Sequence, residues 1–190
     1  QTIARLFNGA SFSTSLGAVI IDGDIYMHPP MTRHGKYPYP HEMRHGVFSV
    51  TKSLTCGLSM FYLAERYGEE IFDALITDYI PEYSPDWENV TFSHALNMVT
   101  GTRENEKGFN FGLFIDVDSA NSKISEISIQ GDLPDTPGDK FNYVSTNTFV
   151  LSFAMQKFVE KQEGDGIYYW DLVRENVLKP IGADSLPLLH

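Results

Sequence analysis

The chain has 190 residues, 42% of them hydrophobic and 13% aromatic, which excludes an intrinsically disordered protein and fits one large domain or two small ones. Its 25 acidic and 14 basic residues give a formal net charge of -11, which argues against nucleic acid and an anionic membrane surface as partners. The single cysteine, Cys56, excludes an internal disulfide framework, and no apolar run is long enough to cross a membrane.

The N-terminal region contains a clear β-hairpin signal. Two short apolar runs, Ala18–Ile21 and Ile25–Met27, flank an Asp22-Gly23 pair, and Asp-Gly favours the tight turn of a hairpin. The preceding residues 1–9 have the pattern of the end of a helix. The following residues 29–46 are rich in Pro, His and Tyr, and they are predicted to form a long loop.

From Ser49 onward the pattern changes to helices. The first is expected to run from Ser49 to Tyr67 and to end at Gly68, because glycine commonly follows the last residue of a helix. A later helix is expected to begin at Thr91 with a T-x-x-H cap. The further predicted helices cover residues 69–80, 91–99, 146–163 and 168–177, with short ones at 109–117 and 124–129.

Two residues at the start of the first helix are candidates for chemistry. Ser49 and Lys52 are three positions apart, so a helix places both on one face, one turn from each other. A serine at a helix start lies at the positive end of the helix dipole, and a neutral lysine beside its hydroxyl makes a nucleophile-and-base pair. The alternative is an ordinary N-cap serine with a surface lysine.

Tyr143 is the third candidate. The segment Pro137–Tyr143 is predicted to form a turn that delivers the tyrosine just before the helix at 146–163. A tyrosine held there can donate or accept a proton at a neighbouring hydroxyl. The alternative is that its ring only packs beneath the loop, which is the commoner role of a single tyrosine.

These residues together resemble the serine β-lactamase and penicillin-binding-protein superfamily. The likeness is strongest to the class C β-lactamase-like branch, which includes carboxylesterases, D-amino-acid peptidases and 6-aminohexanoate-dimer hydrolases. It covers about Gly17 to Asp184. The motifs that carry it follow one another in the family's order: Ser49-Val50-Thr51-Lys52, the stretch Val90–Gly101 that is similar to a segment ending T-S-G, Pro137-Gly138, Tyr143-Val144-Ser145, and Lys179–Asp184, similar to a P-L-G-M stretch.

The resemblance implies an α+β fold, a β-lactamase-like α/β sandwich with a large helical region. Residues 1–48, the hairpin and loop, would belong to the α/β domain, and residues 49–190 would form the mainly helical region with the catalytic motifs. It implies that Ser49 is the acylated nucleophile, Lys52 its base or proton relay, and Tyr143 the group that passes a proton to the leaving group. The Ser49 backbone N–H would form half of an oxyanion hole.

The sequence departs from the family pattern in two places. The tyrosine motif ends in Ser145 where the family often has Asn, and Asn147 follows two residues later. Ser145 and Asn147 are therefore expected to contact the substrate, with esters or small amides favoured over β-lactams. No K-T-G or H-x-G motif follows Lys179–Asp184. The strand that carries this third motif is expected in a C-terminal segment or on a second chain that completes the fold.

The predicted function is a serine hydrolase that acts through an acyl-enzyme on a small-molecule ester or amide, without a cofactor. Two other functions stay open: a non-catalytic binding or sensor domain with the same fold, and a helical interaction module whose S-x-x-K is accidental. Four histidines lie close together in the sequence, but their spacing does not define a metal site, so no metal is expected: His28, His34, His41 and His45. The resemblance slightly favours a periplasmic or secreted location, although the sequence shows neither a signal peptide nor an initiator Met.

Overall fold

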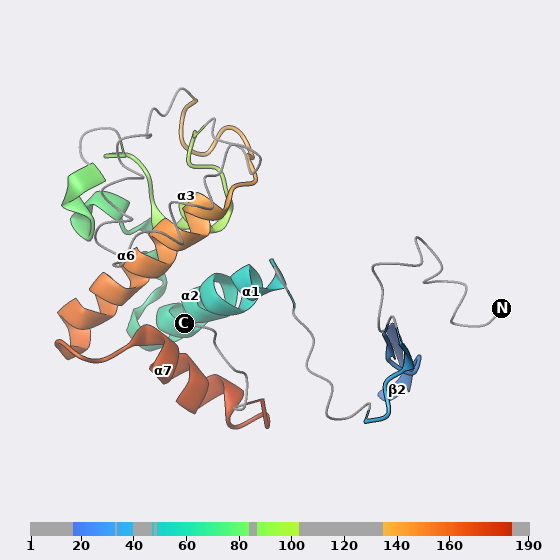
Figure 1. The fold of residues 1–190 in the computed structure, drawn as a ribbon. Helices are drawn as coiled ribbons and strands as arrows, with labels where there is room; N and C mark the ends of the chain where they lie inside the picture. Colours follow the sequence, from blue (N-terminus) through green and yellow to red (C-terminus); the bar gives the residue numbers. More distant parts are fainter. Residues whose placement is uncertain are drawn as a thin grey trace. The chain divides into compact units, whose positions relative to one another are not determined.

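The computed structural model describes residues 17–32, 34–39, 47, 49–83, 87–102 and 135–183. The helices predicted at residues 1–9, 109–117 and 124–129 lie outside these ranges, as do His41 and His45. The chain divides into two compact units, Gln1–Val47 and Phe48–His190 (Figure 1). The described strands and helices agree with the predicted α+β class. The assignment of the first unit to an α/β domain stays a prediction.

The first unit contains the predicted hairpin. Strand β1, Ala18–Ile21, pairs antiparallel with β2, Asp24–Met27, so that Ala18 lies opposite Met27. The two turn residues, Asp22 and Gly23, have φ angles of 53° and 89°, the left-handed conformation that a tight two-residue turn requires. The Asp-Gly signal was therefore sufficient to predict this hairpin.

The loop predicted at 29–46 contains a second small ladder. Strand β3, Met31–Thr32, pairs with β4, Gly35–Lys36. The Thr32 hydroxyl donates a hydrogen bond to the Gly35 carbonyl at 3.1 Å and accepts one from the His34 N–H at 3.1 Å. These local side-chain bonds, together with a Gly35 φ of 104°, close a turn that residue composition alone did not reveal.

The second unit begins with the helix predicted to start at Ser49. It consists of α1, Val50–Lys52, a π-helical turn, Ser53–Leu58, and α2, Ser59–Tyr67. Gly68 ends it with a φ of 111° and an N–H bonded to the Ala64 carbonyl at 2.9 Å. The predicted extent is confirmed, and the π-helical turn in its middle is the one difference.

The helix predicted at 69–80 is wrong. The structure has three short 3-10 turns instead, Glu69–Asp73, Ile76–Asp78 and Pro81–Tyr83. The chain is extended between the first two turns because it pairs there with a later segment: the Ile76 N–H bonds to the Val90 carbonyl, and the Phe92 N–H bonds to the Ala74 carbonyl, both at 2.9 Å. Long-range pairing outweighs the local helical pattern.

The helix α3, Phe92–Leu96, has the predicted cap. The Thr91 hydroxyl accepts a hydrogen bond from the His94 N–H at 3.1 Å, and His94 Nδ1 accepts one from the Thr91 N–H at 3.2 Å. The helix ends earlier than the predicted Val99 because Met98 takes a left-handed conformation with a φ of 56°.

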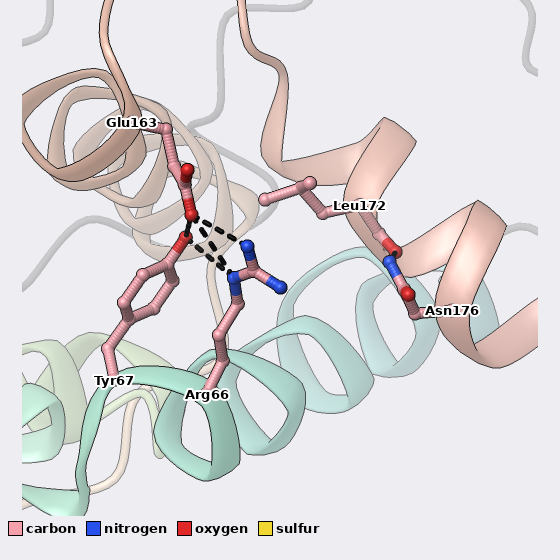
Figure 2. A network of polar contacts seen from close by, with 5 residues as sticks. All are labelled: Arg66, Tyr67, Glu163, Leu172 and Asn176. Atoms are coloured by element: carbon pink, nitrogen blue, oxygen red, sulfur yellow. Dashed lines mark hydrogen bonds and ion pairs between the residues drawn. The ribbon is translucent and has the colours of Figure 1, made fainter.

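The last predicted helices are confirmed. Helix α6 covers Ser145–Glu163, and α7, Tyr169–Val173, continues into a π-helical turn, Arg174–Leu178. At the end of α6, Glu163 Oε1 accepts hydrogen bonds from two residues of α2, the Tyr67 hydroxyl at 2.5 Å and Arg66 Nη2 at 2.8 Å (Figure 2). In the π-helical turn, the Asn176 side chain donates a hydrogen bond back to the Leu172 carbonyl of α7 (Figure 2).

The core of the second unit is built mainly by α2, α6 and the segment around α3. Phe158 of α6 is its aromatic centre, with ring centroids 5.5 Å from Tyr67, 5.7 Å from Tyr79 and 6.5 Å from Phe92. Fully buried side chains of the same core come from α2, from residues 76–90 before α3, and from α6: Met60, Leu63, Ile76, Ile80, Val90, Leu151, Met155 and Val159. Within the described residues, no helix is both long and apolar enough to span a membrane.

Candidate active site

The candidate site begins at the first turn of the helix that carries α1 and α2. Lys52 Nζ lies 3.0 Å from Ser49 Oγ, and the Lys52 N–H donates to the Ser49 carbonyl at 3.1 Å. The second bond closes an i, i+3 turn at the start of the helix, which brings the two side chains together one turn apart. The predicted contact between the hydroxyl and the amine is present in the structure.

Tyr143 lies against the same lysine. Its ring centroid is 5.4 Å from Lys52 Nζ, a distance typical of a cation–π contact. The residues before and after the tyrosine in the chain fix its position. The Asn142 N–H donates a hydrogen bond to the Met98 carbonyl at 2.9 Å, and Val144 is fully buried. The turn before α6 therefore delivers Tyr143 to the helix of Ser49, although the two are far apart in the sequence.

These three side chains open onto a pocket of about 520 Å³. That volume lies within the range of small-molecule sites. Among the described residues that line it, Lys52 carries the only charge. The remaining lining comes from the same helix, from the end of α3 and from α6: Ser53, Cys56, Gly57, Leu58, Phe61, Leu96, Met98 and Thr148.

Cys56 is a second potential nucleophile in the lining. Its Sγ lies 3.2 Å from Ser152 Oγ and 3.4 Å from the Thr148 carbonyl. Burial raises the pKa of the Cys56 thiol above its usual value, so the thiol is protonated at neutral pH. Since the thiolate is the reactive form, Cys56 is a poor nucleophile, and Ser49 is the better candidate.

Ser145 and Asn147, the two residues predicted to contact the substrate, differ from each other in burial and in hydrogen bonding. Asn147 is fully buried, and its Oδ1 accepts a hydrogen bond from the Thr100 hydroxyl at 3.0 Å. Ser145 is half-buried at the first position of α6, and its carbonyl accepts a bond from the Thr148 hydroxyl at 2.8 Å. The α6 side chain on the pocket wall is Thr148. The substrate contacts of Ser145 and Asn147 stay predictions.

Sequence reasoning missed several residues of the pocket. The pocket residues on the nucleophile's helix could be predicted from the sequence. Ser49, Ser53 and Gly57 recur every fourth position, so neighbouring members lie on one face. No spacing or motif in the sequence predicts that Leu96 and Met98 line the pocket. Their place depends on the left-handed turn at Met98 and on its long-range bond to Asn142.

No cluster of metal ligands accompanies this site in the part of the chain that the structure describes, where no three His, Cys, Asp or Glu side chains gather closely enough to hold an ion. His28 and His34, the two members of the histidine group within the described ranges, belong to the first unit.

The chain was compared with models of known protein families. The family model described as Beta-lactamase matches residues 13–186, which is most of the chain. No curated protein matches the chain significantly. The matched span includes Ser49, Lys52 and Tyr143 and covers most of both structural units, although the match does not specify a branch of the family.

Proposed function

The chain belongs to the beta-lactamase family, whose members are in general hydrolases, and we propose that it is a serine hydrolase that forms an acyl-enzyme on Ser49 from a small ester or amide. The observation that carries the proposal is the 3.0 Å separation of Ser49 Oγ and Lys52 Nζ at the mouth of a pocket. A hydroxyl becomes a useful nucleophile when a base takes its proton, and an amine at this distance is placed to do so.

In the first step, Ser49 Oγ attacks the carbonyl carbon while the Lys52 amine accepts the hydroxyl proton. The tetrahedral intermediate then collapses, the bond to the leaving alcohol or amine breaks, and the leaving group takes a proton through the Tyr143 hydroxyl. Water then gives a proton to the Lys52 amine and attacks the acyl carbon. The bond from that carbon to Ser49 Oγ breaks, and Oγ takes the proton back as the acid is released. The Ser49 backbone N–H would stabilise the negative charge on the carbonyl oxygen.

The test is covalent labelling of the full-length protein with a fluorophosphonate probe, followed by peptide mapping. We expect one labelled residue, Ser49, and loss of the label in Ser49→Ala. Ser53→Ala is the matched control, since Ser53 lies one turn later in the same lining, and it should label normally. Cys56→Ser should also label normally. Absence of label, or label on another residue, would contradict the proposal and favour a non-catalytic binding domain.

A further inference from the structure

Hydrogen bonds join the segment 135–142, which leads to Tyr143, to the residues that follow α3. Three of them are backbone bonds: the Asn142 N–H to the Met98 carbonyl at 2.9 Å, the Gly138 N–H to Val99 at 2.7 Å, and the Asp135 N–H to Gly101 at 3.3 Å. A further bond is made by a side chain, since Asn142 Nδ2 donates to the Thr102 carbonyl at 2.7 Å. The chain before Tyr143 is therefore bound along the length of residues 98–102.

Residues 98–102 are a firm support for this chain. Met98, Thr100 and Thr102 are all buried. The Thr100 hydroxyl also donates to Asn147 Oδ1 of α6 at 3.0 Å. At Gly101 the two segments are so close that an added Cβ would overlap a backbone carbonyl oxygen of the segment 135–142. The support is thus held by the body of the second unit, and it leaves little room for the bound chain to approach further.

Asn142 differs from the other residues of this contact because it binds the support at two points. Its backbone N–H reaches Met98 at one end, and its side chain reaches Thr102 at the other. A backbone N–H is common to every residue except proline, whereas the second bond needs a side chain with an N–H or O–H donor. The next residue along the chain is Tyr143, whose ring lies 5.4 Å from Lys52 Nζ.

Building on the proposed function, we infer that Asn142 is a positioning residue that holds the Tyr143 hydroxyl in place to protonate the leaving group. The proton that Lys52 takes from Ser49 passes through this hydroxyl to the leaving oxygen, as the bond from that oxygen to the carbonyl carbon breaks. Such a transfer needs hydrogen-bond distances, and a displacement of about 1 Å can cost about a hundredfold in rate. Without its side-chain bond, Asn142 keeps one of its two attachments, and Tyr143 can shift.

The test compares two butyrate esters on the full-length protein. Both give the same butyryl-enzyme, so a difference in kcat/KM between them reports the departure of the leaving group. Ethoxide is a strong base that needs a proton in order to leave, whereas p-nitrophenolate leaves without one. Asn142→Ala should therefore lower kcat/KM about tenfold to a hundredfold for ethyl butyrate, and at most about threefold for p-nitrophenyl butyrate. An equal loss on both esters would overturn the inference.

Asn97 provides the matched control. Its Nδ2 likewise donates to a backbone carbonyl, that of Ser93 at 2.9 Å, but this bond stays within the α3 region. Asn97→Ala should leave the ratio of the two kcat/KM values unchanged. The same shift in this ratio as in Asn142→Ala would show that the position of Asn142 is not special, and it would overturn the inference.

A double variant tests whether Asn142 acts through Tyr143. In a Tyr143→Phe background, Asn142→Ala should cause no further loss on ethyl butyrate, because the hydroxyl that it positions is already absent. A further loss of about tenfold would show that Asn142 acts by another route. Thermal unfolding checks the fold of each variant. If Asn142→Ala does not fold, Asn142→Ser should give the same change in the ester ratio; failure of both to fold would make Asn142 a residue of the fold and overturn its positioning role.

Fluorophosphonate labelling separates this inference from the proposed function. Fluoride leaves the probe without a proton from Tyr143, so Ser49 should be labelled in Asn142→Ala as in the wild type. An unlabelled wild type would contradict the proposed function. A labelled wild type, together with an unchanged ester ratio in Asn142→Ala, would overturn the role of Asn142 and leave the proposed function standing.

Discussion

The ring of Tyr143 lies 5.4 Å from Lys52 Nζ, measured to the ring centroid, so the lysine has the ring and the Ser49 hydroxyl as neighbours. Tyr143→Phe keeps the ring but removes the phenolic hydroxyl. If that hydroxyl passes a proton to the leaving group, kcat should fall about 10²- to 10⁴-fold while the melting temperature stays unchanged. Steady-state kinetics and thermal unfolding check both quantities. Near-normal kcat would mean that Tyr143 only packs against the lysine.

Lys52 is predicted to be the base for Ser49. Lys52→Met keeps most of the volume of the side chain but removes the amine, so the acylation rate should fall at least a hundredfold. Stopped-flow release of p-nitrophenol during the first turnover measures that rate. Lys161→Met, an exposed lysine on α6, is the matched control and should acylate normally. Equal acylation rates in the two variants would place the base elsewhere.

Glu163 is predicted to make the fold sensitive to acid. The hydrogen bond from Tyr67, and then those from Arg66, hold the pKa of the Glu163 carboxyl below its usual value (Figure 2). The unfolded chain therefore binds this proton more readily than the folded one. The resulting stabilisation is present above the ordinary carboxyl pKa of about 4.3 and is lost as the pH falls through the lowered value.

Glu163→Gln should therefore reduce the drop in melting temperature between pH 6 and pH 3, while it lowers the melting temperature at pH 6. Glu65→Gln, at an exposed position of α2, serves as the control for the loss of one carboxylate. Calorimetry at several pH values measures the two profiles. An unchanged pH dependence in Glu163→Gln would show that this network does not contribute to acid unfolding.

The buried bond between Thr100 and Asn147 is predicted to stabilise the second unit. Thr100→Val keeps the shape of the side chain but leaves Asn147 Oδ1 without the donor that it has at 3.0 Å. Asn147 Nδ2 is already buried without a partner among the described residues. Losing the bond should cost about 1–3 kcal/mol in the free energy of unfolding, measured with urea. The exposed Thr136→Val should cost much less.

Ser145 is predicted to favour esters over β-lactams. An Asn side chain offers both a donor and an acceptor and can hold an acylamido group from two sides, whereas a serine hydroxyl is shorter. The wild type should therefore have a higher kcat/KM for p-nitrophenyl butyrate than for a chromogenic cephalosporin. Ser145→Asn should raise turnover of the cephalosporin with little loss on the ester. A wild-type preference for the cephalosporin would contradict the prediction.

The sequence by itself determined the elements whose signals are local. The Asp22-Gly23 turn, the Thr91 cap and the glycine that ends α2 each act within a few residues, so their positions were predictable. The pair Ser49 and Lys52 belongs to the same class, because helical geometry alone brings side chains three positions apart onto one face. The family resemblance, confirmed over residues 13–186, needed no structure either.

Only the tertiary structure decided what depends on contacts between distant segments. Residues 69–80 carry a helical pattern, but pairing of Ala74 and Ile76 with the segment at Val90 breaks it into short turns. In the same way, Tyr143 reaches Lys52 because Asn142 bonds to the backbone of a left-handed Met98. Such long-range hydrogen bonds satisfy buried backbone groups. They cannot be predicted from the spacing of residues in the sequence, because they join segments that only the fold brings together.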